Sequence, residues 1–223
     1  MVPGAEHHLL RLSQTAMPTL FEKFTDDTVA NVTLLKGSEV KKIRRGLFAT
    51  YPSQEESLAA LIPNKASLQL VKCRNRAQLL VLNKQVLFFA PLKSQWLPHL
   101  TLLHRLPGLL PAVTIDRGAA RAVMHGANMM APGVQSKPHV FDPLHPENEV
   151  EEEEEEVEEE EEEESSDAGF EREYISFYGP NCKTACAIAM LAERTPKEIA
   201  DNRGIYAENL MHIGDGLWHK QTI

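Results

Sequence analysis

Two groups of cationic side chains in this sequence have the spacing needed to bind phosphates. Arg117, Arg121 and His125 recur every four residues, so a helix would present all three on one face. Four more cations crowd a second helix-like stretch: Lys41, Lys42, Arg44 and Arg45. Arginine suits two-point contact with a phosphate group, and such contacts position a polyanion without making or breaking bonds. These residues therefore indicate binding rather than catalysis.

Both groups also fit a plainer interpretation, because cations opposite an apolar stripe are typical of any solvated helix face. The cations near residue 41 accompany such a stripe, formed by Val40, Ile43, Leu47 and Tyr51. The sequence alone favours a solvated face for this helix and leaves a phosphate-binding face open. It leaves the same two interpretations open for Arg117 and Arg121.

Residues for other kinds of chemistry are sparse. Cys182 and Cys186 resemble half of a zinc site, but no second pair of ligands accompanies them. The chain contains no Walker phosphate loop, no GxSxG turn and no HExxH helix. We therefore expect no metal, no cofactor and no catalytic residue.

Arg117, Arg121 and His125 belong to the stretch Thr114 to Val134, whose sequence predicts a strand, a capped helix and a second strand. A short strand leads to Asp116, whose carboxylate can accept hydrogen bonds from the first turn of a helix. Gly126 suits the left-handed residue that ends a helix, and a second strand closes at Pro132-Gly133. The side of the helix opposite the cations favours close packing on a small barrel, through Ala119, Ala122 and Val123.

Residues 21–92 have the pattern of a small α+β domain. A helix is expected from Ser38 to about Thr50, and a second follows the capping box Ser53–Glu56. Asn83-Lys84 fits a two-residue hairpin turn. The strands expected in this domain are Leu68–Cys73, Gln78–Leu82 and Gln85–Phe89.

A connecting segment, residues 93–111, leads to the C-terminal part of the chain. It contains a short helix, Pro98–Leu106, whose leucines can clamp two domains in a fixed arrangement. Trp218 is expected to plug a barrel. The strands expected after residue 170 are Tyr174–Tyr178, Thr184–Leu191 and Tyr206–Ile213, with a capped helix starting at Thr195.

The net charge of −9 hides a basic fold. Seventeen acidic residues and no Lys or Arg lie between Asp142 and Asp167, and thirteen of them are glutamates between 151 and 164. Without this segment the chain has 23 basic and 15 acidic residues, a balance of +8. Because so dense a run of like charges repels itself, we expect a disordered insertion at 135–170, and a flexible extension at 1–20.

The sequence indicates a cytoplasmic protein. Three cysteines offer no disulfide framework and fit a reducing compartment. No apolar run approaches the roughly 20 residues that span a bilayer, and the N-terminus lacks the features of a secretion signal. No membrane partner is expected.

The stretch from Asp116 to Gly133 resembles the signature of a PUA domain, a compact β-barrel that binds structured RNA. Further motifs resemble, in their order, the malignant T-cell amplified sequence family of translation factors, which is related to the N-terminal part of ligatin. They are Leu87-Phe-Phe89, Pro98–His104, Leu110-Pro111 and Asp215-Gly-Leu-Trp-His219. The resemblance implies an α+β fold, with a small N-terminal α/β domain and a PUA β-barrel made of residues 112–134 and 171–223.

The resemblance also implies a function. Members of this family are non-enzymatic, bind the small ribosomal subunit and the acceptor end of tRNA, and pair with density-regulated protein. They act in unconventional initiation, in reinitiation and in ribosome recycling. In that picture the N-terminal domain holds the ribosome and the partner chain, and the PUA domain faces the tRNA.

Site residues follow from this picture. Small residues near the signature let a nucleic-acid backbone approach closely, whereas Met129 and Met130 are expected in the core. The RNA-binding candidates are Arg117, Gly118, Arg121, Gly126, Ala127, Asn128, Ala131, Pro132 and Gly133. The ribosome-binding candidates are Lys41, Lys42, Arg44 and Arg45.

Two questions stay open at this point. A rival hypothesis is an accessory subunit of an enzyme that modifies tRNA or rRNA, because PUA domains often accompany such enzymes; yet about 90 residues are few for their catalytic domains. A chaperone for basic proteins would rest on the glutamate run alone. The run itself is either an inert solvated insertion or a segment that folds back on the basic surface and competes with RNA.

Overall fold

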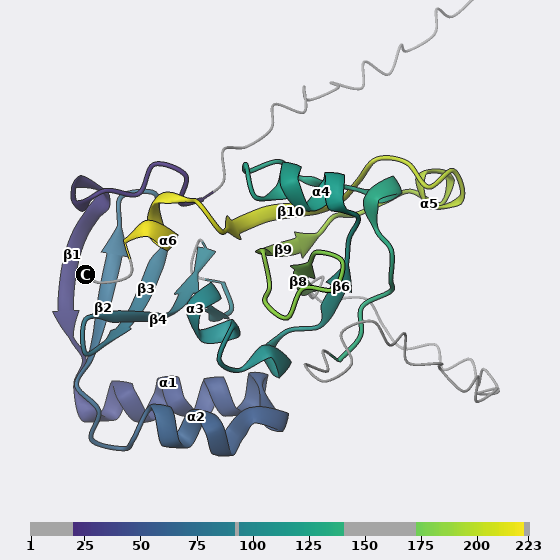
Figure 1. Ribbon diagram of the computed structural model, residues 1–223. Coiled ribbons are helices and arrows are strands. Elements are labelled where there is room, and N and C mark those ends of the chain that lie inside the picture. The colour runs from purple at the N-terminus through teal and green to yellow at the C-terminus, as the bar shows by residue number, and fades with distance from the viewer. Residues whose placement is uncertain (1–19, 92–93, 141–172, 221–223) are drawn as a thin grey trace, which may run out of the picture.

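Strand pairing divides the chain into two five-stranded sheets (Figure 1). The structure is a computed structural model that describes residues 20–91, 94–140 and 173–220. Helices and two separate sheets make up the α+β fold that the sequence predicts. Residues 1–19 of the predicted flexible extension and residues 141–170 of the predicted acidic insertion lie outside the described residues.

The N-terminal sheet has the strand order β1-β2-β3-β4-β5, and all neighbouring strands are antiparallel. Its central strands confirm the sequence prediction: β2 (Leu68–Cys73), β3 (Gln78–Leu82) and β4 (Gln85–Ala90). Asn83 and Lys84 have φ angles of 51° and 66°. Positive φ at both positions is what a type I′ hairpin turn requires.

Two outer strands were not predicted. β1 (Val29–Leu34) is exposed along almost its whole length, so it lacks the alternation that marks a half-buried strand. β5 (Leu97–Pro98) pairs with β4 where the sequence predicts the start of a helix. That helix, α3 (Leu100–Leu103), is therefore shorter than predicted.

Helices α1 (Gly37–Thr50) and α2 (Glu55–Leu61) lie side by side below the N-terminal sheet in Figure 1. α1 begins one residue before the predicted Ser38, and the Glu39 carboxylate accepts a hydrogen bond from Lys36 N–H at 2.8 Å. Three members of the predicted apolar stripe are buried: Val40, Leu47 and Tyr51. The stripe therefore anchors α1 and leaves its cations facing away from the core.

The start of α2 differs from the prediction. Pro52–Gln54 forms a turn of 3₁₀ helix (η2), and Gln54 precedes α2, so Ser53 does not cap it. Proline at the first position of η2 fits a helical start because its missing N–H would be unpaired there in any case.

The second sheet has the strand order β6-β8-β9-β10-β7. β6 and β7 lie at opposite edges, yet Val134 after β7 forms a bridge with Ile115 after β6. The two edges therefore meet, which curls the sheet into the predicted PUA-like barrel. Its strands are β6 (Ala112–Thr114), β7 (Met129–Met130), β8 (Tyr174–Tyr178), β9 (Ala187–Leu191) and β10 (Ile205–His212).

Two local features complete the barrel. Thr195 and Glu198 form the predicted capping box of α5 (Pro196–Ala200), with Thr195 N–H donating to the Glu198 carboxylate at 3.0 Å. Beyond β7, His139 N–H donates to Ala112 O at 2.9 Å, and Ala112 N–H donates back to His139 O at 2.7 Å. The fold thus continues into residues 135–140, which the sequence analysis assigned to the insertion.

The two sheets meet at a junction built from α3, η4 (Pro107–Leu109) and the C-terminal helix α6 (Gly216–His219). Leu100 and Leu103 are completely buried in an apolar core that extends from the N-terminal sheet into the barrel, and Leu106 packs against it. The leucine clamp predicted for this segment is present.

Trp218 lies in this junction and joins α6 to α3 rather than plugging the barrel as predicted. Its ring stacks on His99, with centroids 6.5 Å apart and planes inclined by 11°. The ring also meets His104 edge-on, at 5.5 Å between centroids. Burial lowers the pKa of His99 to about 4, so at neutral pH the residue is an uncharged stacking partner.

Direct backbone contact brings α6 against the first described residues. Gly216 N–H donates to Phe21 O at 3.0 Å. A Cβ atom on Gly216 would lie 2.5 Å from Phe24 N and 2.8 Å from Phe24 O, so only glycine permits this approach. The Asp215 carboxylate accepts from Trp218 N–H at 2.7 Å and starts the helix at this position.

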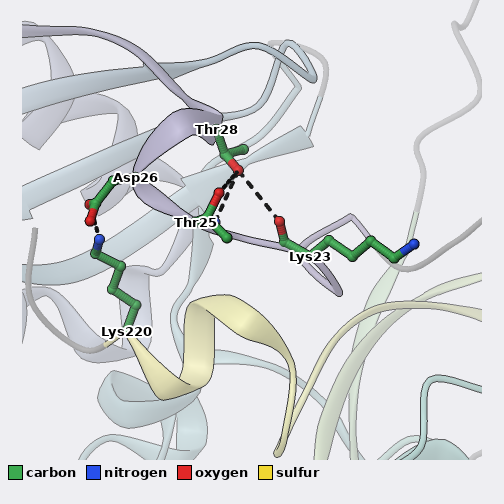
Figure 2. A network of polar contacts seen from close by, with 5 residues as sticks. All are labelled: Lys23, Thr25, Asp26, Thr28 and Lys220. Carbon is green, nitrogen blue, oxygen red and sulfur yellow. Dashed lines mark hydrogen bonds and ion pairs between the residues drawn. The ribbon is translucent and has the colours of Figure 1, made fainter.

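An ion pair and several hydrogen bonds involve the residues next to Phe24 in the chain (Figure 2). Lys220, just after α6, pairs with Asp26 of η1 (Asp26–Thr28). Thr28 Oγ1 accepts from Thr25 N–H at 3.0 Å and donates to Lys23 O at 3.5 Å. Because solvent screens the exposed Asp26, the apolar and backbone contacts stabilise the junction more than the ion pair does.

We expect Gly216→Ala to destabilise the protein by about 1–3 kcal/mol, because the added methyl group pushes α6 away from the Phe24 backbone. Gly46→Ala in α1 is the matched control, since nothing lies within 4 Å of an added Cβ there. Alanine is favoured over glycine inside a helix by about 0.5–1 kcal/mol. Urea unfolding should shift the two midpoints in opposite directions; an unchanged midpoint for Gly216→Ala would contradict the packing described.

Candidate nucleic-acid interface

The helix that carries the first basic group is α4 (Arg117–Val123). Asp116 caps it as predicted: its Oδ1 accepts from Gly118 N–H at 2.6 Å and from Ala119 N–H at 2.9 Å. Arg117 and Arg121 are both exposed. The cap therefore fixes the start of the helix that carries both arginines.

The packed face of α4 is rotated from the prediction. Ala120 and Val123 are buried, Ala119 is half-buried, and Ala122 is exposed. The loop after β8 lies against this face, since a Cβ on Gly179 would be 3.6 Å from the Ala120 methyl group. The predicted packing role of Ala122 is thus wrong, and the arginines keep their exposed positions.

The end of α4 is tied to the barrel by an asparagine that the sequence did not reveal. Asn209 on β10 donates from Nδ2 to Val123 O at 2.9 Å and to Ala127 O at 3.1 Å. Asn128 Oδ1 in turn accepts from Asn209 N–H at 3.0 Å. Asn128, a candidate RNA contact, thus also has a structural role. Gly126, with φ of 86°, ends the helix as predicted.

The glycine-rich stretch after β7 divides into packed and exposed residues. Gly133 is needed for packing, because a Cβ there would lie 2.7 Å from the Ala119 methyl group and 3.0 Å from Asp116 Oδ2. Ala131 is buried, so its side chain is not available for the RNA contact that the sequence analysis gave it. Pro132 is exposed beside α4.

The two methionines of β7 point in opposite directions, as alternation along a strand requires. Met129 is buried, as predicted. Met130 is 50% exposed and pairs with Ile205, so its predicted place in the core is wrong. It adds an apolar side chain to the surface next to the candidate residues.

The second basic group lines a hollow beside α1 and α2, which we call the α1–α2 groove. Its volume is about 1080 Å³. Lys41, Arg44 and Arg45 line it together with Lys65, whereas Lys42 lies outside the lining. Lys65 follows α2 in the sequence and was missed because only the packing of the two helices brings it to the same hollow.

Arg44 is held in place within this groove. Its guanidinium carbon lies 5.0 Å from the centroid of the Phe48 ring, and its Nη1 donates to Asn64 Oδ1. Lys41 and Arg45 are exposed at the rim, and Glu55 is the one acidic residue among those lining the groove. The groove thus presents a fixed arginine between freer cations, which suits phosphate oxygens.

The two cysteines of the predicted half-site differ in their exposure. Burial raises the pKa of Cys186 to about 12, so this thiol stays protonated, while Cys182 is exposed. Within residues 20–91, 94–140 and 173–220, no group of three or more His, Cys, Asp or Glu residues could hold a metal ion. No helix in these ranges is long and apolar enough to cross a membrane.

Comparison with known proteins agrees with this architecture. Residues 24–107 match the family model of the Pre-PUA-like domain. The chain is 30% identical over 204 residues to Malignant T-cell-amplified sequence 1-B of Xenopus laevis, across 91% of this chain and 99% of that protein. The chain belongs to the malignant T-cell-amplified sequence family. Translation machinery-associated protein 20 of Saccharomyces cerevisiae, also a relative, is 30% identical over 201 residues, across 90% of this chain and 98% of its own length.

Solved structures support the fold of this malignant T-cell-amplified sequence family member. A hypothetical protein of the archaeon Pyrococcus horikoshii OT3 superposes with a TM-score of 0.56 at 17% identity, over 86% of this chain and 99% of its own. A conserved PUA domain protein of Thermoplasma acidophilum gives 0.51 at 16% identity, with the same coverage. The name of the yeast relative indicates a role in translation for the family.

Asp116→Ala should cost about 0.5–2 kcal/mol of stability, because it removes the acceptor for two N–H groups at the start of α4. Asp116→Asn keeps an acceptor and should stay close to the parent protein. Urea unfolding of both variants measures the difference. If the alanine and asparagine variants unfold at the same concentration, the cap does not hold α4 as described.

Proposed function

We propose that this protein is a non-enzymatic, cytoplasmic translation factor that binds the small ribosomal subunit and the acceptor end of tRNA. It acts in unconventional initiation, reinitiation and ribosome recycling, together with a density-regulated-protein-like partner chain. The observation that carries the proposal is the pairing of two exposed basic surfaces across one fixed junction. Membership of a family that includes translation machinery-associated protein 20 supports the translational setting.

The α4 surface supports the tRNA part of the proposal. Arg117 and Arg121 stand exposed on a capped helix, and Met130 and Pro132, in the stretch that follows α4 along the chain, are also exposed. Arginines contact phosphates, while apolar side chains suit the faces of unpaired bases. A surface of this kind fits a single-stranded RNA end next to a duplex.

The α1–α2 groove supports the ribosomal part. Lys41, Arg44 and Arg45 form a concave basic surface with Lys65, on a different domain from α4. Concave basic surfaces follow a nucleic-acid backbone without reading its sequence. We assign the groove to ribosomal RNA and α4 to tRNA, since one chain holding both must contact them at separate places.

Arg117→Glu combined with Arg121→Glu should weaken tRNA binding at least about tenfold at 100 mM salt and lower the salt dependence of the affinity, because phosphate contacts are lost. Both side chains are exposed, so the fold should survive. Fluorescence anisotropy with labelled tRNA over a salt series measures both quantities.

The matched control is Lys72→Glu with Arg74→Glu, which makes the same change of charge at exposed positions of the N-terminal domain. The control should keep most of the affinity and the salt slope. An equal loss in both double variants would mean that only net charge matters. An unchanged affinity in the α4 variant would remove α4 from the interface.

A further inference from the structure

The lining of the α1–α2 groove carries a large excess of positive over negative charge. Lys41, Arg44, Arg45 and Lys65 surround the hollow, and Glu55 is the single acidic residue among those lining it. Like charges held this close repel one another and favour a polyanionic occupant. The same chain carries a polyanion of its own, the thirteen glutamates of residues 151–164.

The topology fixes the point from which this glutamate run leaves the barrel. After β7 the chain runs antiparallel to β6, because Val134 bridges Ile115 and His139 bridges Ala112. It therefore travels away from the α4 end of β6 and reaches the end where β6 begins. Val140 follows His139 directly and is the last described residue before the segment that contains the glutamate run.

The chain returns at the same end of the barrel. β8 is parallel to β6, with Ser176 opposite Ala112, so Tyr174 lies beyond the start of β6. Tyr174 also reaches the loop between β4 and β5 of the N-terminal sheet, where its hydroxyl donates to Ser94 Oγ at 3.5 Å. Both ends of the segment that contains the glutamates thus stand on the side facing the N-terminal domain.

The groove lies close to this end of β6. η4 precedes β6 by two residues, and it packs against η2, where a Cβ on Gly108 would lie 2.9 Å from Gln54 Nε2. Gln54 is followed directly by Glu55, which lines the groove. In Figure 1, α1 and α2 lie below the sheets and α4 lies at the top, on the opposite side of the barrel.

We propose that the glutamate run docks in the α1–α2 groove of its own chain. About ten residues connect each end of the run to the barrel, and an extended chain spans about 3.3–3.6 Å per residue, so each connection reaches about 30 Å. Tethering gives the run a millimolar effective concentration at the groove, so even weak carboxylate–cation contacts are populated at low salt. Salt weakens this docking, because exposed charges are screened within about 10 Å at 0.1 M.

The consequence is an internal competitor for the groove. Docking itself does not depend on the proposed function, whereas competition with ribosomal RNA rests on it. A small subunit presents many more phosphates than the run has carboxylates, so ribosomal RNA displaces the run and isolated short RNAs do not. The docked run thus makes the groove select ribosomal RNA, a large polyanion, over short RNAs.

The experiment uses no RNA, so its result is independent of the proposed function. A variant of the full chain has all thirteen glutamates of residues 151–164 changed to glutamine, which empties the groove without shortening the chain. The probe is a fluorescent peptide with the sequence of residues 147–167. At 20 mM salt the peptide should bind the glutamine variant at least about tenfold more tightly than the parent chain, because the tethered run no longer competes.

Charge-reversing substitutions show where the peptide binds. In the glutamine variant, Lys41→Glu with Arg45→Glu should weaken peptide binding at least about tenfold. Lys72→Glu with Arg74→Glu, the same change of charge elsewhere on the domain, should change it less than about threefold. Light scattering should show a monomer for the parent chain at every concentration used.

Three results would overturn the proposal. The first is equal peptide affinity of the parent chain and the glutamine variant. The second is loss of peptide binding on Arg117→Glu with Arg121→Glu but not on the groove substitutions, which would put the run on α4. The third is a dimer of the parent chain that the glutamine variant does not form, which would put the run in the groove of a second copy.

Discussion

The close approach of Gly216 to the backbone of Phe21 and Phe24 determines how the two domains of this protein face each other. A side chain at this position would separate α6 from the N-terminal domain and would draw Trp218 away from His99 and His104. The apolar core is continuous across the contact, and α4 packs on the barrel through a second cluster that includes Ala120 and Val123, so the α1–α2 groove and α4 belong to one body. The Asp-Gly-Leu-Trp-His motif thus has a structural role: it holds the two basic surfaces in one body.

The local distribution of charge matters more for this protein than its net charge. The net charge is −9, yet the two surfaces that point to a function are cationic. Exposed charges act over about 10 Å at 0.1 M salt, so a phosphate at α4 or in the groove responds to the arginines and lysines beside it. The glutamate run can influence such a phosphate only by occupying the same place, which makes its position, and not its charge alone, the physical question.

Features set by short stretches of sequence were predictable, and features set by packing were not. The central strands, the Asn83-Lys84 turn and the Asp116 cap follow from local patterns, and the structure has them. β1 was missed because an exposed edge strand needs no apolar alternation. Within the candidate site, the rotation of α4 and the roles of Lys65 and Asn209 depend on residues brought together only by the fold.

Site-specific crosslinking tests most directly the claim that the two surfaces hold different RNAs. Cys182 is exposed while Cys73 and Cys186 are buried, so a photo-crosslinker can be attached beside α4. Ser38→Cys in a Cys182→Ser background moves the crosslinker to the groove. In reconstituted complexes of small ribosomal subunit, initiator tRNA and this protein, the Cys182 probe should label tRNA and the residue-38 probe ribosomal RNA. Labelling of the same RNA from both positions, or of neither from either position, would contradict the account.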